Sequence, residues 1–215
     1  MTRPFPDVRR QTMPAADPLL RWVAGVLFAA LPGTVPAAEA TTPSLARAEA
    51  AADELGRSLR EALTARLLAD GAPEAVEFCH AQAPVIAGEV AIRHGVQLGR
   101  IGVRLRNPAN AATGWQAEVL QAFAKRAAAG EAPEQLRHVE TAADGSLRYA
   151  RGIRTEAPCL VCHGPALPAA VAAAVAARYP DDHAHGFGEG ELRGALWVEV
   201  PAGTALRNDG AAARD

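Results

Sequence analysis

The sequence predicts an α+β fold in which N-terminal helices flank a mainly antiparallel sheet. Two long stretches of helical periodicity come first, two alternating segments flank an Asp-Gly turn in the second half, and another alternating segment follows near the end. An Asp-Gly turn between two strands indicates a hairpin, and hairpin strands are antiparallel neighbours. The element order therefore differs from the strict strand-helix alternation that builds a parallel sheet.

The first two elements are expected to be helices over residues 44–68 and 73–94. In the first, leucines recur at helical intervals between charged residues, a stripe that we interpret as core packing. The second has proline in its first turn and ends before Gly95, a typical C-terminal stop. Pro84 lies inside this helix and is expected to kink or divide it.

The later elements follow from alternation and from turn residues. In order, we expect a strand at 97–105, a turn at 107–110, a helix at about 115–129, hairpin strands at 135–141 and 146–154, a helix at about 168–179 and a strand at 192–200. Residues 203–215 are expected to form a frayed tail.

Length and charge limit the class of protein. The chain has 215 residues and a formal net charge of −2, so it offers no basic field for nucleic acid. The longest apolar run after the first forty residues, 169–177, is far shorter than the roughly 20 residues of a membrane span. We therefore expect no nucleic-acid partner and no stable membrane span in the mature chain.

Residues 1–40 are expected to be a signal peptide. Arginines precede an apolar stretch at residues 22–31, and Ala38-Glu39-Ala40 matches the A-x-A form of a cleavage site, with cleavage after residue 37 as a second possibility. An uncleaved anchor is the weaker alternative, because the apolar stretch is only about ten residues long. We expect one periplasmic domain over residues 41–202.

The run Cys159-Leu160-Val161-Cys162-His163 is a C-x-x-C-H motif. In this pattern two thiols add to the vinyl groups of a haem, and the adjacent imidazole becomes an axial ligand of the iron. The two intervening residues make a turn that faces both sulfurs the same way. The motif predicts one covalent haem c held by the two cysteines, with the histidine as its proximal ligand.

Few residues of the sequence could be the ligand on the opposite side of the iron. Both methionines lie in the segment expected to be removed. The remaining candidates are Cys79, His80, His94, His138, His183 and His185, or no ligand. Cys79 is the odd cysteine of an exported chain, so it is either a ligand or a buried structural residue. His80 is the second choice, and the other histidines are interpreted as surface, capping or loop residues.

Two non-haem interpretations use the same residues. Zinc would take Cys159, Cys162, His163 and, as a fourth ligand, Cys79. A disulfide between Cys159 and Cys162 is the other alternative.

No distal His-Arg pair of the kind that a peroxidase uses is identifiable by spacing. We therefore expect no enzyme and no catalytic residue.

Several stretches together resemble a known family. They are Cys79 with residues 83–87, residues 99–100, 105–110 and Trp115, residues 159–164, residues 179–182, Gly186, Gly190 and residues 193–195. In combination they resemble exported single-haem c-type cytochromes of PAS-like fold, long catalogued as a domain of unknown function. The sequence departs from that pattern at Gly102, where a hydroxyl residue is expected, and at Gln116, where an acid is expected.

The resemblance implies a PAS-like sheet and a haem held through Cys159 and Cys162, with His163 proximal and Cys79 as an unusual distal ligand. It also implies a sensory role for some members. The hypothesis that we favour for this chain is a haem protein that acts in electron transfer or redox sensing. A gas sensor in which Cys79 leaves the iron on reduction is the alternative. The redox partner and the oligomeric state stay open.

Three arginines near the middle of the chain are further candidates for the haem site. Arg100, Arg104 and Arg106 would lie on one face of the expected strand, where their guanidinium groups suit haem propionates. An ordinary basic solvent face is the alternative.

Overall fold

The computed structural model describes residues 37–203. Most of the expected signal peptide, residues 1–36, and most of the expected tail, residues 204–215, lie outside the described residues.

The described chain contains five α-helices and four strands. The helices are α1 (Ala37–Ala69), α2 (Ala72–His94), α3 (Trp115–Ala128), α4 (Leu160–His163) and α5 (Ala169–Arg178). The strands are β1 (Gln97–Gly102), β2 (Arg137–Thr141), β3 (Leu147–Arg154) and β4 (Leu192–Val200). A 3₁₀ turn, η3 (Ala157–Cys159), leads directly into α4.

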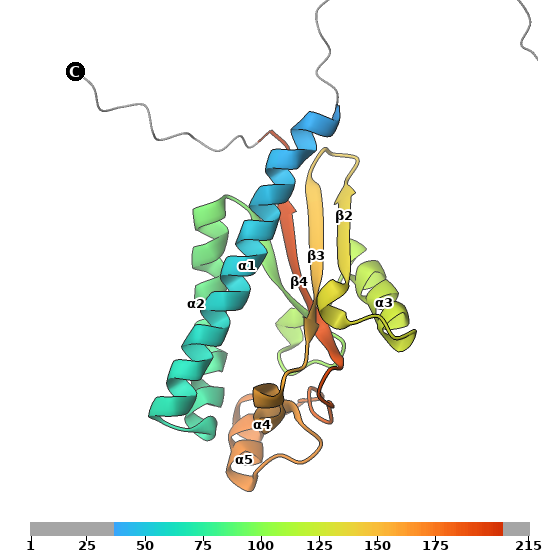
Figure 1. The fold of residues 1–215 in the computed structure, drawn as a ribbon. Coiled ribbons are helices and arrows are strands. Elements are labelled where there is room, and N and C mark those ends of the chain that lie inside the picture. Colours follow the sequence, from blue (N-terminus) through green and yellow to red (C-terminus); the bar gives the residue numbers. More distant parts are fainter. Residues whose placement is uncertain (1–36, 204–215) are drawn as a thin grey trace, which may run out of the picture. The chain divides into compact units, whose positions relative to one another are not determined.

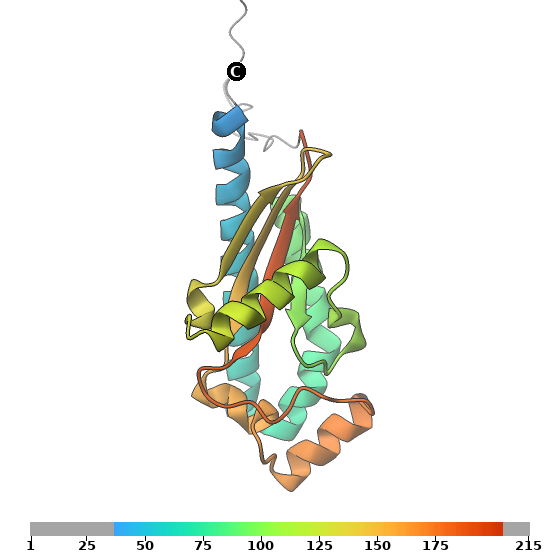
Figure 2. The ribbon, with the colours of Figure 1, turned by 90° about the vertical axis from the view of Figure 1, so that its right-hand side faces the viewer.

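The four strands form one antiparallel sheet in the order β1-β4-β3-β2. Helices α1 and α2 run side by side on one face of this sheet (Figure 1). Helix α3 crosses the opposite face (Figure 2). Helices α4 and α5 lie together near one end of the sheet, beside α2 (Figures 1 and 2). The predicted α+β class with a PAS-like antiparallel sheet is confirmed.

Each sheet face has its own apolar core because strand side chains alternate between the two faces. Alanines and Leu55 of α1 pack with Tyr149, Leu196 and Val198 on one face. On the other face, Phe123 of α3 packs with Ala195 and its neighbours. A third cluster joins α2 to α5, and the partly buried Cys162 packs against it.

The expected division of α2 and the expected length of the first strand were wrong. Helix α2 continues through Pro84, which lies on an exposed side of the helix. The first strand ends at Gly102 and not at residue 105. The chain folds back there, and the carbonyl oxygen of Arg104 would lie 2.9 Å from a β-carbon placed at Gly102. Only glycine leaves room for that turn.

Helix α1 begins at Ala37, seven residues before the expected start at residue 44. The remaining expected elements are confirmed within about two residues, including the antiparallel pairing of the hairpin strands. No helix in residues 37–203 combines the length and the apolar character of a membrane span.

Candidate functional site

Three segments far apart in the sequence meet below the end of the sheet. They are helix α4, the bend after β1 and the loop between α5 and β4. The backbone N–H of Phe187 donates to the carbonyl of His163 at 2.9 Å, and that of Gly186 donates to Gly164 at 2.8 Å. The N–H of His183 donates to the carbonyl of Leu105 at 2.7 Å. These backbone bonds fix the loop against α4 on one side and against the bend on the other.

Helix α4 is a single turn that carries the C-x-x-C-H motif. The N–H of Cys159 donates to the carbonyl of Glu156 at 2.9 Å, so the turn begins in η3. It stops at Gly164, where a β-carbon would lie 2.5 Å from the carbonyl oxygen of Leu160. Cys159 and Cys162 are three residues apart on this turn and therefore lie on the same side of it. Both are half-buried free thiols.

His163 is held in one orientation by a backbone carbonyl. Its Nδ1 lies 2.5 Å from the carbonyl oxygen of Ala184. Since a carbonyl only accepts, Nδ1 carries the proton and the lone pair remains on Nε2. Burial, and then the charges of Arg193 and Arg106, lower the pKa of His163 from 6.5 to about 2. The imidazole is thus neutral at any physiological pH, as a metal ligand must be.

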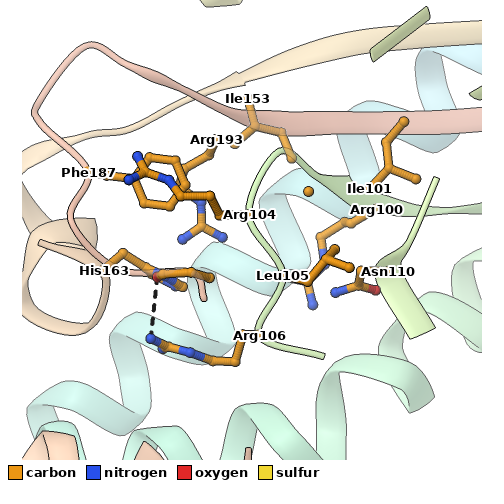
Figure 3. A pocket seen from close by; sticks show the side chains of 12 residues that line it. Arg100, Ile101, Arg104, Leu105, Arg106, Asn110, Ile153, His163, Phe187 and Arg193 are labelled. Atoms are coloured by element: carbon orange, nitrogen blue, oxygen red, sulfur yellow. Dashed lines mark hydrogen bonds between the residues drawn. The ribbon is translucent and has the colours of Figure 1, made fainter. Parts of the chain in front are cut away.

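A cavity of about 50 Å³, partly open to solvent, lies beside His163. Figure 3 shows the side chains that surround it, drawn from the strands, the bend and the loop. The lining residues are Arg100, Ile101, Gly102, Arg104, Leu105, Arg106, Asn110, Ile153, His163, Ala184, Phe187 and Arg193. All three arginines of the sequence prediction line this cavity, together with a fourth arginine, Arg193.

Cys79 lies on α2, on the side that faces α4 and α5. Val76 packs in the cluster that contains Cys162, and Cys79 follows Val76 by three residues, so both lie on one face of the helix. Burial raises the pKa of the Cys79 thiol, and the charges of Arg100 and Arg106 partly oppose this shift. The charge of Cys79 in turn contributes to the raised pKa of Cys162. The thiols predicted as haem ligands therefore share one electrostatic environment with the arginines of the cavity.

Arg104 and Arg106 are paired with acids of the protein. The Arg106 guanidinium donates to the two carboxylate oxygens of Asp182 at 3.0 and 3.1 Å and to the carbonyl of Cys162 at 2.6 Å. Arg104 donates to the carboxylate of Glu191 at 3.1 Å. The expectation that these residues share a strand face with Arg100 was wrong, because β1 ends before either of them.

The sequence alone did not single out Arg193 as a candidate. It is the second residue of β4, and its carbonyl accepts from the N–H of Val103 at 3.1 Å, which places it beside the bend after β1. The only signal in the sequence was its place in the Arg193-Gly194-Ala195 stretch. A β-carbon at Gly194 would lie 1.9 Å from the carbonyl oxygen of Ile101, so the glycine permits the two strands to approach.

The other candidate histidines have partners elsewhere. His80 packs edge-on against Tyr179, with ring centroids 5.1 Å apart. His94 lies 2.6 Å from the carboxylate of Glu54, and His138 stacks on Trp115. His183 and His185 are exposed. Within residues 37–203, no three His, Cys, Asp or Glu side chains are grouped as a metal site.

Fold and site together define an α+β domain of PAS-like architecture with a C-x-x-C-H helix beside an arginine-lined cavity. Residues 34–201 match the Tll0287-like family, and the chain belongs to this family. Among solved structures, the chain is similar to the crystal structure of the cyanobacterial heme-protein Tll0287. The two are 31% identical, the match covers 58% of this chain and 71% of that chain, and the TM-score is 0.47. A comparison with curated protein sequences found no match.

Proposed function

We propose that this chain is a periplasmic c-type haem protein that acts in electron transfer or redox sensing. Cys159 and Cys162 would attach one haem covalently, His163 would be its proximal ligand and Cys79 its distal ligand. Membership in a family that includes a heme-protein supports haem as the cofactor. When bound, haem supplies an iron that takes up and releases one electron.

The observation that carries this proposal is the state of His163. Its proton is fixed on Nδ1 by the carbonyl of Ala184, and its pKa keeps the ring neutral. A backbone acceptor on the far ring nitrogen is the usual second-shell partner of a metal-bound histidine. The two thiols of the same motif, Cys159 at the end of η3 and Cys162 on α4, complete a donor set that suits a haem.

Cys79 is the favoured distal ligand because of its position and its surroundings. It lies on the face of α2 that meets α4. The ring of His80 already packs edge-on against Tyr179. A thiolate ligand donates charge to the iron and favours the ferric state. On reduction its release would open a site for a diatomic gas, which is the second candidate function.

The proposal includes export and the absence of catalysis. Residues 1–40 would direct the chain to the periplasm, where covalent haem attachment takes place. N-terminal sequencing of the mature protein from a periplasmic extract tests this, with Thr41 as the expected first residue. A mature protein that begins at residue 1 in the cytoplasm would contradict it.

The first experiment is the absorption spectrum of the protein after expression with haem-attachment machinery. A c-type spectrum that stays with the denatured polypeptide supports covalent haem. Cys162→Ala is expected to leave a single thioether bond, and His163→Ala is expected to change the ferric spectrum. A wild-type chain without any haem spectrum would refute the proposal and favour zinc or a disulfide.

The second experiment compares Cys79→Ala with His80→Ala under carbon monoxide. If Cys79 is the distal ligand, its variant binds the gas readily and has an altered ferric spectrum, while the neighbouring variant behaves like wild type. If carbon monoxide leaves the wild-type absorption spectrum unchanged, electron transfer is favoured. If the gas shifts the Soret band of the wild type, gas sensing is favoured. If only His80→Ala alters the spectrum, His80 is the distal ligand and the assignment of Cys79 is wrong.

A further inference from the structure

Arg100 and Arg193 differ from the other two arginines of the cavity. Within residues 37–203, Arg104 and Arg106 form ion pairs with Glu191 and Asp182, whereas the side chains of Arg100 and Arg193 form no hydrogen bond and no ion pair. The cavity therefore holds two guanidinium charges that no carboxylate of the described chain neutralises.

The positions of these two side chains direct their charges toward the same space. Arg100 follows Leu98 by two residues on β1, and residues two apart on a strand share a face. Leu98 packs against the core under α1 and α2, so Arg100 lies on the sheet face that these helices cover. Arg193 lies at the start of the neighbouring strand, β4. Both side chains line the cavity beside His163 (Figure 3).

Both guanidinium groups are unfavourably placed without an anion. Burial lowers the pKa of the Arg100 guanidinium. Burial also lowers the pKa of the Arg193 guanidinium, and the charges of Arg100 and Arg106 lower it further. A desolvated cation without a counter-charge costs free energy, and a guanidinium is shaped to hold a carboxylate through two parallel hydrogen bonds. A ligand with two carboxylates would match two free guanidinium groups.

We propose that Arg100 and Arg193 bind the two propionate carboxylates of the haem, while Arg104 and Arg106 hold the loops of the site. This inference rests on the proposed function, since it assigns residues to the same cofactor. It replaces the expectation that Arg100, Arg104 and Arg106 act alike. In the apo protein the same pair would hold carboxylates or other small anions weakly.

The test uses the haem-loaded protein and three variants: Arg100→Gln, Arg193→Gln and Arg104→Gln. The third is the matched control, because Arg104 lines the same cavity but is already paired. Resonance Raman spectroscopy reports hydrogen bonding to the propionates through their bending bands. We expect these bands to shift in the first two variants and to stay at the wild-type position in Arg104→Gln.

The reduction potential supplies a second measurement. Removing a positive charge beside the haem disfavours the electron-rich ferrous state, so Arg100→Gln and Arg193→Gln are expected to have lower midpoint potentials than Arg104→Gln. Arg100→Lys and Arg193→Lys retain the charge but lose the forked geometry. They are expected to restore the potential and still to shift the propionate bands.

The outcomes separate this inference from the proposed function. A wild-type chain without covalent haem refutes the proposed function before any variant is compared. A loaded wild type whose bands and potential are unchanged in Arg100→Gln and Arg193→Gln overturns the inference alone. Equal shifts in all three glutamine variants also overturn it. If the glutamine variants do not fold, the lysine variants decide, and unchanged propionate bands in them contradict the assignment.

Discussion

Replacing Asp182 with asparagine is expected to cause a large loss of stability. The side chains of Asp182 and Arg106 are 8% and 13% exposed, and two hydrogen bonds of 3.0 and 3.1 Å join them. The same carboxylate accepts from the N–H of Ala184 at 2.9 Å. The variant leaves the Arg106 charge buried without its partner, which typically costs about 3–5 kcal/mol.

The expected change is measurable by thermal or chemical unfolding. For a domain of this size, each kcal/mol lowers Tm by about 2–4 °C, so a decrease of roughly 6–20 °C is expected. Asp181→Asn is the matched control, because Asp181 is the exposed neighbour and has no ion pair within residues 37–203. Far-UV circular dichroism of both variants and of wild type gives the three transitions.

The same replacement also tests how the site is positioned. Ala184 is the residue whose carbonyl fixes His163, so loosening the loop is expected to change the ferric haem spectrum of Asp182→Asn. An Asp182→Asn protein that loses less than about 1 kcal/mol, no more than the control, would refute the reasoning. That result would mean that the pair is effectively solvated.

Three further replacements probe the fold. Gly194→Ala places a β-carbon where the carbonyl oxygen of Ile101 would lie 1.9 Å away, and a loss of about 1–3 kcal/mol in urea unfolding is expected. An unchanged midpoint would contradict this close approach. Pro84→Ala restores a helix hydrogen bond at an exposed position and is expected to stabilise by up to about 3 kcal/mol. A less stable variant would show that the proline is needed for packing. Hydrogen bonds from His94, and from the arginine before it, lower the pKa of Glu54 below 4.5. Its stabilisation is therefore complete above about pH 4.5 and lost as the pH falls through the lowered pKa, so Glu54→Gln should differ from wild type only above that range. A difference that persists at pH 2 would contradict it.

Most of the secondary structure was predictable because it depends on local patterns. Helical periodicity and Gly95 located α2 within one residue at each end, and alternation located β4. The end of β1 was not predictable. It depends on the chain folding back over Gly102, a contact with no local pattern of its own.

The sequence by itself determined which residues are candidates to bind a cofactor. The C-x-x-C-H motif is recognisable because it consists of five consecutive residues. Cys79 is recognisable as a candidate because it is the one cysteine outside that motif. Only the tertiary structure decided which arginines are free. Arg106 meets its acid 76 positions along the chain, and Arg104 meets its acid 87 positions along. These long-range ion pairs neutralise two of the four guanidinium groups. Local sequence patterns cannot predict which two, because the acids lie far along the chain.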